Sequence, residues 1–410
     1  MKTYKKMSQK FWLGLLFILL LNGVGNSLFA QARVMEQVVE PLIESEEVNF
    51  RIVRVVEGLE HPWAIGWLPD GRMLVTERPG RMNLVDGNNV TRLNNLPPIH
   101  HEEDQRTAPQ GGSQAGLLDV AVHPDYDNNG WIYFTYSSPG DADGVDNHRA
   151  TGTALARARL HENGTDLVEL ETIYTLIPRT EPGRHYGSRI VFPGDRTVMF
   201  SIGDRGIRHP SQDLTNPAGS VIRLLEDGGA APDNPFVNTP PGNLRPEIYS
   251  FGHRNNQGMT IDPATGEIWA LDHGPSGGDL LYRIEKGNNY GWPQVSYGAE
   301  YSTGEHIGIG RDAPGVTPPV FVWEYSMAPS GLTFFNGDQF KAWNGNLFAG
   351  SLLLERIYRL VLENGIVTHH EILIPEKIGR IRDVRQGPDG LIYIATDESE
   401  GGVYRLEPVE

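Results

Sequence analysis

The sequence contains no cysteine, and this absence removes several kinds of chemistry. With 0 Cys among 410 residues, disulfide staples, thiolate catalysis and cysteine–zinc sites are excluded. Long apolar runs are also scarce. After residues 11–21 (FWLGLLFILLL), no stretch approaches the roughly 18 apolar residues that span a bilayer as a helix. Neither a phosphate-binding loop nor an HExxH metalloprotease motif occurs.

The amino-terminal segment has the composition of an export signal. Four lysines and no acidic residue lie in 1–10, the apolar run follows, and Ala30-Gln31-Ala32 offers a small-residue cleavage site. We therefore expect 1–30 to be a secretory signal peptide and 31–47 a linker. The protein is then expected to be periplasmic or secreted, with no membrane span after signal cleavage.

Basic residues are outnumbered by acidic ones. Lys and Arg total 35 against 52 Asp and Glu, which gives a formal net charge of −17 at pH 7. A field of that sign disfavours nucleic acid and anionic membrane surfaces, so neither is expected as a partner. Solubility and cation binding would each account for the acidity.

What the chain does contain is one strand–turn–strand phrase that recurs six times. The clearest copy is PWAIGWLPDGRMLVTERPGRMNLVD at 62–86, in which Pro69-Asp70-Gly71 fits a tight turn. Further copies begin near residues 116, 187, 258, 331 and 381, and no long segment shows a helical period. The sequence predicts an all-β fold, a six-bladed β-propeller of four-stranded antiparallel blades over 48–410. A pair of irregular β-sandwiches is the alternative.

Charged and polar residues gather where the repeat strands begin, and a propeller brings such positions together around its channel. His185 lies in a glycine-flanked segment and can take a proton near neutral pH. Arg254 and Asn255 offer donors to carbonyl or carboxylate oxygens. Arg380 and Arg382 share one face of a strand, as a site for a polyanionic small molecule requires. Loop hydrogen bonds, strand caps and salt bridges are the plainer structural alternatives.

A glycine-rich loop, DHGPSGGD at 272–279, follows one repeat strand. Loops of this kind expose backbone carbonyls, which are good ligands for hard cations. Most glycine-rich loops are only turns, so the loop alone does not predict a metal site.

Read together and in order, these segments resemble the soluble quinoprotein glucose/sorbosone dehydrogenase family, and within it the periplasmic aldose sugar dehydrogenase branch. The resemblance extends from about Val53 to Leu406. The phrases that carry it are GLEHPWAIGWLPDGRMLVTERPGR, GLLDVAVHPDY, HYGSRIVF, SIGDRG, APDNPF, SFGHRNNQG, DHGPSGGD, KGNNYGWP, APSGL and GRIRDVRQGPDG. The family is a propeller that binds pyrroloquinoline quinone (PQQ) and Ca²⁺. It oxidises the C1 hydroxyl of aldoses to lactones.

The resemblance implies roles for the candidate residues. His185 becomes the general base that takes the proton of the sugar C1 hydroxyl, while the C1 hydride passes to C5 of the quinone. Arg254 would polarise the quinone C5 oxygen, with Asn255 as a neighbouring donor. Arg380 and Arg382 would grip the cofactor. Electrons would leave to a periplasmic acceptor or an artificial dye.

The same resemblance suggests a set of metal and substrate residues. The carbonyls of Gly274 and Pro275 would hold the Ca²⁺ of the cofactor, and Tyr290 and Glu300 are possible ligands of a further ion. Gln114 lies near the position of a substrate-side polar group.

Two departures from the family pattern are visible. Leu353 occupies the place of a lysine that usually contacts the cofactor, and Leu280 stands where an acid usually follows Asp279. Two other functions therefore stay open for a propeller of this kind. One is a Ca²⁺-dependent lactonase or esterase, and the other is a non-catalytic carbohydrate- or protein-binding module.

Overall fold

A computed structural model describes residues 31–101, 113–140, 150–181, 183–240 and 243–409. The expected signal peptide, 1–30, lies outside these described residues. Within them the chain forms 25 β-strands, the short helix α1 (Tyr126–Asn129) and short 3-10 segments at His209–Gln212 and Lys341–Trp343. None of the described helices has the length and apolarity needed to cross a bilayer.

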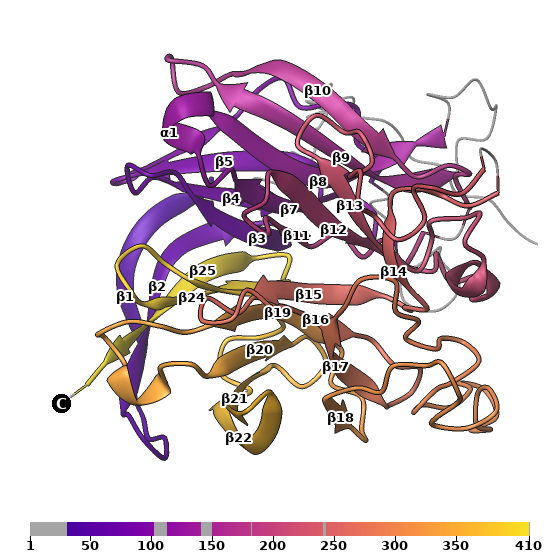
Figure 1. The fold of residues 1–410 in the computed structure, drawn as a ribbon. Coiled ribbons are helices and arrows are strands. Elements are labelled where there is room, and N and C mark those ends of the chain that lie inside the picture. Colours follow the sequence, from indigo (N-terminus) through magenta and orange to yellow (C-terminus); the bar gives the residue numbers. More distant parts are fainter. Residues whose placement is uncertain (1–30, 102–112, 141–149, 182, 241–242, 410) are drawn as a thin grey trace, which may run out of the picture. The chain divides into compact units, whose positions relative to one another are not determined.

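The strands form six antiparallel sheets, which are the blades of the predicted propeller (Figure 1). The first blade has β3 (Pro62–Trp67), β4 (Met73–Glu77), β5 (Arg81–Asp86) and β6 (Asn89–Arg92). The second has β7 (Leu117–Val122), β8 (Trp131–Pro139), β9 (Thr151–Leu160) and β10 (Leu167–Thr175). The third has β11 (Ile190–Val191), β12 (Thr197–Ile202), β13 (Ser220–Leu225) and β14 (Ile248–Phe251). The fourth has β15 (Asn256–Ile261), β16 (Ile268–Asp272), β17 (Asp279–Ile284) and β18 (Phe321–Trp323), and the fifth has β19 (Pro329–Phe334), β20 (Leu347–Ser351), β21 (Arg356–Glu363) and β22 (Ile366–Pro375).

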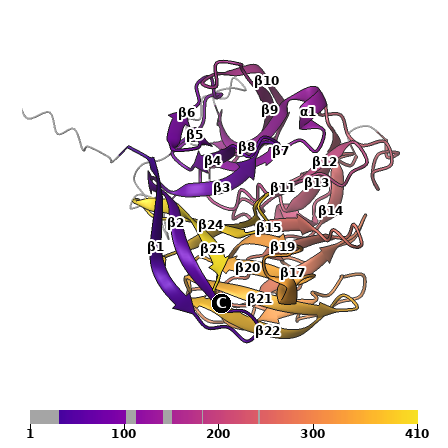
Figure 2. The same ribbon diagram turned by 90° about the vertical axis from the view of Figure 1, so that its left-hand side faces the viewer.

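The sixth blade joins the two ends of the described chain and closes the ring. It contains β23 (Ile381–Gln386), β24 (Ile392–Thr396), β25 (Gly401–Pro408) and, from the amino-terminal side, β2 (Phe50–Leu59). Figure 2 shows β1 (Arg33–Ile43) and β2 running beside the yellow β25. The segment 31–47, expected as a linker, therefore consists largely of a fifth strand on this blade, because β1 pairs antiparallel with the edge of β2, with three register shifts along the pair.

Each blade begins at the channel with the first strand of the repeated phrase. These inner strands are β3, β7, β11, β15, β19 and β23, and each contacts the next around a complete ring. Apolar side chains fill the space between neighbouring blades; Leu74 and Met82 of the first blade, for example, pack in one cluster with Phe134 and Ala156 of the second. Burial of these faces is the main favourable contribution to the fold.

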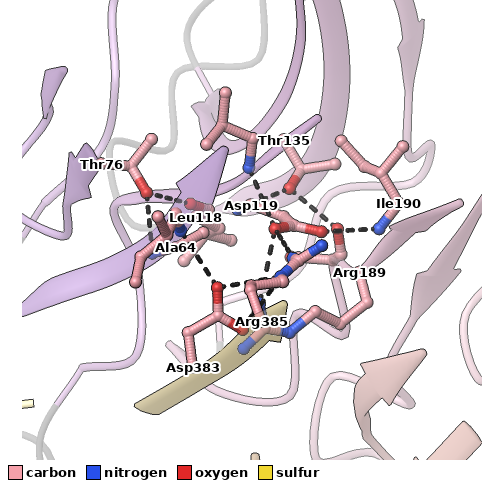
Figure 3. A network of polar contacts seen from close by, with 12 residues as sticks. Ala64, Thr76, Leu118, Asp119, Thr135, Arg189, Ile190, Asp383 and Arg385 are labelled. Carbon is pink, nitrogen blue, oxygen red and sulfur yellow. Dashed lines mark hydrogen bonds and ion pairs between the residues drawn. The ribbon is translucent and has the colours of Figure 1, made fainter. Parts of the chain in front are cut away.

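The middle of the channel is closed by four charged side chains, Asp119, Arg189, Asp383 and Arg385, which we call the channel plug (Figure 3). Arg189 Nη1 lies 2.8 Å from Asp383 Oδ1, and Arg385 Nη2 lies 2.6 Å from Asp119 Oδ1. Two cations thus face two anions. Both carboxylates also accept backbone N–H groups, Asp383 from Ile65 and Asp119 from Ile190.

The plug lies between two cavities along the same inner strands. Trp63, Leu118 and Arg382 line a cavity at the strand entrances, which we call the entrance cavity. Ile65, Val120 and Arg385, two or three positions further along the same strands, line a second cavity at the other end. Four of the residues that the sequence singled out line the entrance cavity, namely Gln114, Asn255, Arg380 and Arg382.

Candidate functional site

The entrance cavity has a volume of about 760 Å³ and is rich in cationic and amide side chains. Four predicted residues, Gln114, Asn255, Arg380 and Arg382, line it. Next to it is a second space of about 580 Å³, the side cavity, lined by Gln114, Arg184, His185, Asp204, Gly206, Arg208, Arg254, Trp292, Tyr301 and Ser302. Because Gln114 lines both, the two spaces share a wall, with His185 and Arg254 on the side-cavity part.

His185 is held for proton transfer by a buried carboxylate. Its Nδ1 lies 2.6 Å from Oδ1 of Asp204, which leaves Nε2 as the nitrogen available to a substrate. Burial, aided by the charge of Arg254, lowers the pKa of His185, so the imidazole is neutral at pH 7. Burial alone would raise the pKa of Asp204, but the histidine and Arg254 bring it below its usual value. The pair is therefore a neutral base oriented by an ionised acid.

The backbone around His185 is unusual and is fixed by several contacts. His185 has φ of +55° and Ser188 has φ of +99°, both in the left-handed region that non-glycine residues rarely occupy. The His185 N–H donates to Gln114 Oε1 at 2.8 Å, and the Ser188 N–H donates to the Ser201 carbonyl at 2.7 Å. Strained backbone that its surroundings hold in place is typical of functional sites.

Arg254 and Asn255 are positioned by a second buried acid, Asp272. Its carboxylate accepts the backbone N–H groups of Arg254 and Asn255, at 2.9 and 2.5 Å. Burial raises the pKa of Asp272 to about 7. The Arg254 guanidinium donates to the carbonyl of His273 and to Tyr301 Oη, whereas Asn255 Oδ1 accepts the Gly187 N–H. The Asn255 amide nitrogen is thus the part of that side chain left for a ligand.

Arg380 and Arg382 lie together on the wall of the entrance cavity. Arg380 donates through Nη1 to the Leu352 carbonyl at 3.1 Å. Arg382 donates to Gln257 Oε1 and forms an ion pair with Asp397. Burial alone would raise the pKa of Asp397, but Arg382 and a hydrogen bond from His61 hold it well below its usual value.

Sequence reasoning missed two residues of the site, Asp204 and Arg78. Arg78 is only 5% exposed, and the one hydrogen bond of its side chain to a described residue runs from Nη1 to the Ser113 carbonyl. Its Nε is buried without a protein partner, and no carboxylate among the described residues forms an ion pair with it. The phrase TERPGR could have indicated this buried arginine, because it places Arg78 directly after a buried strand, where an arginine is rarely found only for contact with solvent.

The residues predicted for metal binding have the following surroundings. The Gly274 N–H donates to Asp279 Oδ1 at 2.7 Å, and the Pro275 carbonyl accepts the Ala299 N–H at 2.8 Å. Tyr290 Oη donates to the Arg283 carbonyl, and Glu300 is bound through both oxygens by Arg208. Among the described residues, no group of three or more His, Asp or Glu side chains is arranged to hold an ion. The metal assignments therefore stay predictions, and those of Gly274 and Pro275 depend on backbone carbonyls.

The two departures from the family pattern have different surroundings. Leu353, in the place of the usual lysine, is 54% exposed next to Leu352, which lines the entrance cavity. Leu280 is buried in the apolar cluster of Met259 and Ala270. An acid at position 280 would have to be desolvated there, so leucine fits this blade better than a carboxylate would.

Comparison with known proteins agrees with this arrangement. A family model described as glucose/sorbosone dehydrogenase matches residues 59–405. The chain is 39% identical over 381 residues to an uncharacterised protein of Synechocystis sp., covering 89% of this chain and 88% of that one. It is 35% identical over 366 residues to the aldose sugar dehydrogenase YliI of Escherichia coli K12, covering 88% of this chain and 93% of that one.

Solved structures give the same picture. The PQQ-bound form of the aldose sugar dehydrogenase of Streptomyces coelicolor matches with a TM-score of 0.67 and 25% identity, over 92% of this chain and 98% of that one. The six-bladed fold, the arginine-lined cavity and the match of the family model over nearly the whole described chain agree with one another. The chain therefore belongs to the glucose/sorbosone dehydrogenase family.

Proposed function

We propose that the protein is a PQQ-dependent aldose dehydrogenase that oxidises the C1 hydroxyl of sugars to the lactone. The observation that carries the proposal is the His185–Asp204 pair, which faces a cavity beside a second cavity rich in arginine. A base and a site for a polyanionic cofactor are the two parts that this oxidation requires. We further propose that it acts in the periplasm or outside the cell and delivers electrons to an acceptor there.

The entrance cavity fits a cofactor with several carboxylates. Its volume of about 760 Å³ lies in the usual range of pockets that bind small molecules and cofactors. Arg78 and Arg382 each keep a buried Nε without a protein partner, and Arg78 has no described ion-pair partner. Unpaired buried donors are costly unless a ligand satisfies them. Together with the Asn255 amide and Arg380, these two arginines form a donor set for carboxylate and quinone oxygens. The arginines also supply positive charge, which the usual lysine would have contributed at position 353.

When bound, PQQ would supply an ortho-quinone that accepts the hydride. The residues of the chain would take up the proton and stabilise the charges that develop. His185 takes the C1 hydroxyl proton at Nε2, and Asp204 stabilises the imidazolium that results. Arg254, fixed by Asp272, places a positive charge where negative charge develops on the cofactor side. Gly274 and Pro275 are the residues we propose for the Ca²⁺ of the cofactor, through their carbonyls.

The function is tested with the mature protein purified without cofactor. After addition of PQQ and Ca²⁺, we expect dye reduction that depends on added aldose and is lost in His185→Ala. Absence of activity with every aldose, together with an unchanged quinone absorption on mixing, would contradict the proposal. Turnover of esters or lactones by the same preparation would favour a hydrolase instead.

Arg78 gives a separate prediction for cofactor binding. We expect Arg78→Met to weaken PQQ binding by about 10- to 100-fold, because a charge-assisted hydrogen bond to a carboxylate is lost in a desolvated site. Titration of the quinone absorption with the apo protein measures the affinity. The Tm of the apo protein, recorded in parallel, separates a lost cofactor contact from a folding defect. Unchanged affinity in a folded Arg78→Met protein would show that Arg78 does not contact the cofactor.

A further inference from the structure

The side cavity carries an excess of positive charge next to the base. Three arginines, Arg184, Arg208 and Arg254, line it, and Asp204 is the one acidic residue among the described residues of its lining. That carboxylate is already engaged by His185 Nδ1, by the Gly206 N–H and by Trp292 Nε1. Its one negative charge, which already interacts with Arg254, cannot balance three arginines.

The three arginines differ in their partners. Arg208 is paired with both carboxylate oxygens of Glu300, at 2.5 and 2.8 Å. Arg254 is held by the His273 carbonyl and by Tyr301 Oη. The guanidinium of Arg184, by contrast, makes no hydrogen bond or ion pair with any residue in the described part of the chain. Arg184 is thus a partly buried cation beside the base, and none of the described residues serves as its counter-ion.

Backbone contacts hold the main chain of Arg184 in place. Its carbonyl accepts a hydrogen bond from Arg205 Nη1 at 2.5 Å, and the adjacent Gly183 carbonyl accepts the Gln114 N–H at 2.7 Å. The side chain then runs along Gly206, where a Cβ would lie 2.6 Å from Arg184 Nε. Glycine at 206 thus leaves room for the guanidinium at the cavity wall, and a larger residue would displace it.

A partly desolvated guanidinium without an ion-pair partner among the described residues favours an anionic group that it can bind through two hydrogen bonds. We infer that the side cavity selects aldoses that carry a negatively charged group remote from C1, with Arg184 as the residue that binds this group. The inference rests on the proposed function, since it supposes that the C1 hydroxyl faces His185. A carboxylate, as in a uronic acid, and a phosphate ester share the required chemistry.

The test compares kcat/KM for D-glucuronate, D-glucose 6-phosphate and D-glucose in the wild-type holoenzyme and in Arg184→Gln. We expect the wild type to favour at least one anionic sugar by about 10- to 100-fold, and to lose that preference at high salt because the charges are partly exposed. In Arg184→Gln the ratio of anionic to neutral kcat/KM falls toward one. The exposed Arg311, paired with Glu324 on the surface, gives the matched control Arg311→Gln, which keeps the wild-type ratio.

The outcomes separate this inference from the proposed function. Preference for the phosphate ester or for the uronate tells which anion the cavity takes. If neutral aldoses react and the ratio is the same in wild type and Arg184→Gln, the inference is wrong and the proposed function stands. If no sugar reacts, the proposed function fails, and calorimetric titration of the protein with glucuronate and glucose 6-phosphate decides the inference. Binding that is lost in Arg184→Gln supports it, and equal or absent binding overturns it.

Discussion

Replacing Asp204 by Asn is expected to lower kcat for aldose oxidation by about 10²- to 10⁴-fold, with a much smaller change in KM. Asn keeps the shape of the side chain but removes the charge that stabilises His185 as it takes the proton. This charge matters because Asp204 is fully buried and His185 is only 8% exposed, so that water can replace little of it. Steady-state dye reduction by the reconstituted enzyme measures the effect.

Two further measurements test whether Asp204 acts through His185. The double variant His185→Ala with Asp204→Asn should be no slower than His185→Ala alone, because residues that act as a unit give non-additive losses. An additive loss would show that Asp204 works independently of His185. The quinone absorption of each variant with PQQ serves as the control, since neither residue lines the entrance cavity among the described residues.

The pH dependence of kcat/KM tests the direction in which Asp204 shifts the pKa of His185. His185 has its pKa lowered by burial and Arg254, so wild-type kcat/KM should fall only as the pH drops below about 6.5, where the base becomes protonated. Asp204 opposes this shift by raising the pKa of the histidine. In Asp204→Asn the acid limb should therefore move to still lower pH. Movement to higher pH would contradict the assigned pair.

The propeller could be predicted because each copy of the repeat contains turn-forming residues between two strands. Pro69-Asp70-Gly71 connects β3 to β4 as expected, and each recurring phrase forms the inner strands of one blade. β1 was not predictable from its own residues. Its pattern is mixed, it contains Pro41, and it becomes a strand because β2 offers an edge for pairing. Tertiary pairing decides such a segment, and local propensity does not.

The site was predictable where residues stand within a recognisable phrase, and unpredictable where a partner is distant. His185, Arg254 and Arg382 were singled out in this way, and the structure brings them to the walls of adjoining cavities. Asp204, although only 19 residues from His185, acts through a contact that the sequence order does not reveal. The role of Arg78 depends on the absence of an ion-pair partner among the described residues, which no sequence pattern expresses.

The channel plug supports the strands that line the entrance cavity. Arg189 is 1% exposed and donates from Nη1 to Asp383, from Nη2 to the carbonyl of Arg382 and from Nε to the carbonyl of Gln257. Through these carbonyls it fixes the strands that carry the donors of the entrance cavity. Its charge also balances Asp119 and Asp383 together with Arg385. Removal would leave two buried carboxylates facing one arginine and two carbonyls without a donor.

We therefore expect Arg189→Met to destabilise the fold by about 3–5 kcal/mol, since breaking a buried ion pair leaves an uncompensated buried charge, and to lower the Tm by about 5–10 °C. Thermal unfolding of the apo protein, followed by circular dichroism, measures the change. Arg311→Met removes an exposed pair with Glu324 and should leave the Tm within about 1 °C. Equal Tm values for the two variants would mean that the plug contributes no more than a surface pair. A large loss in Arg189→Met alone would mean that the charges of the channel plug stabilise the propeller well beyond what a surface pair contributes.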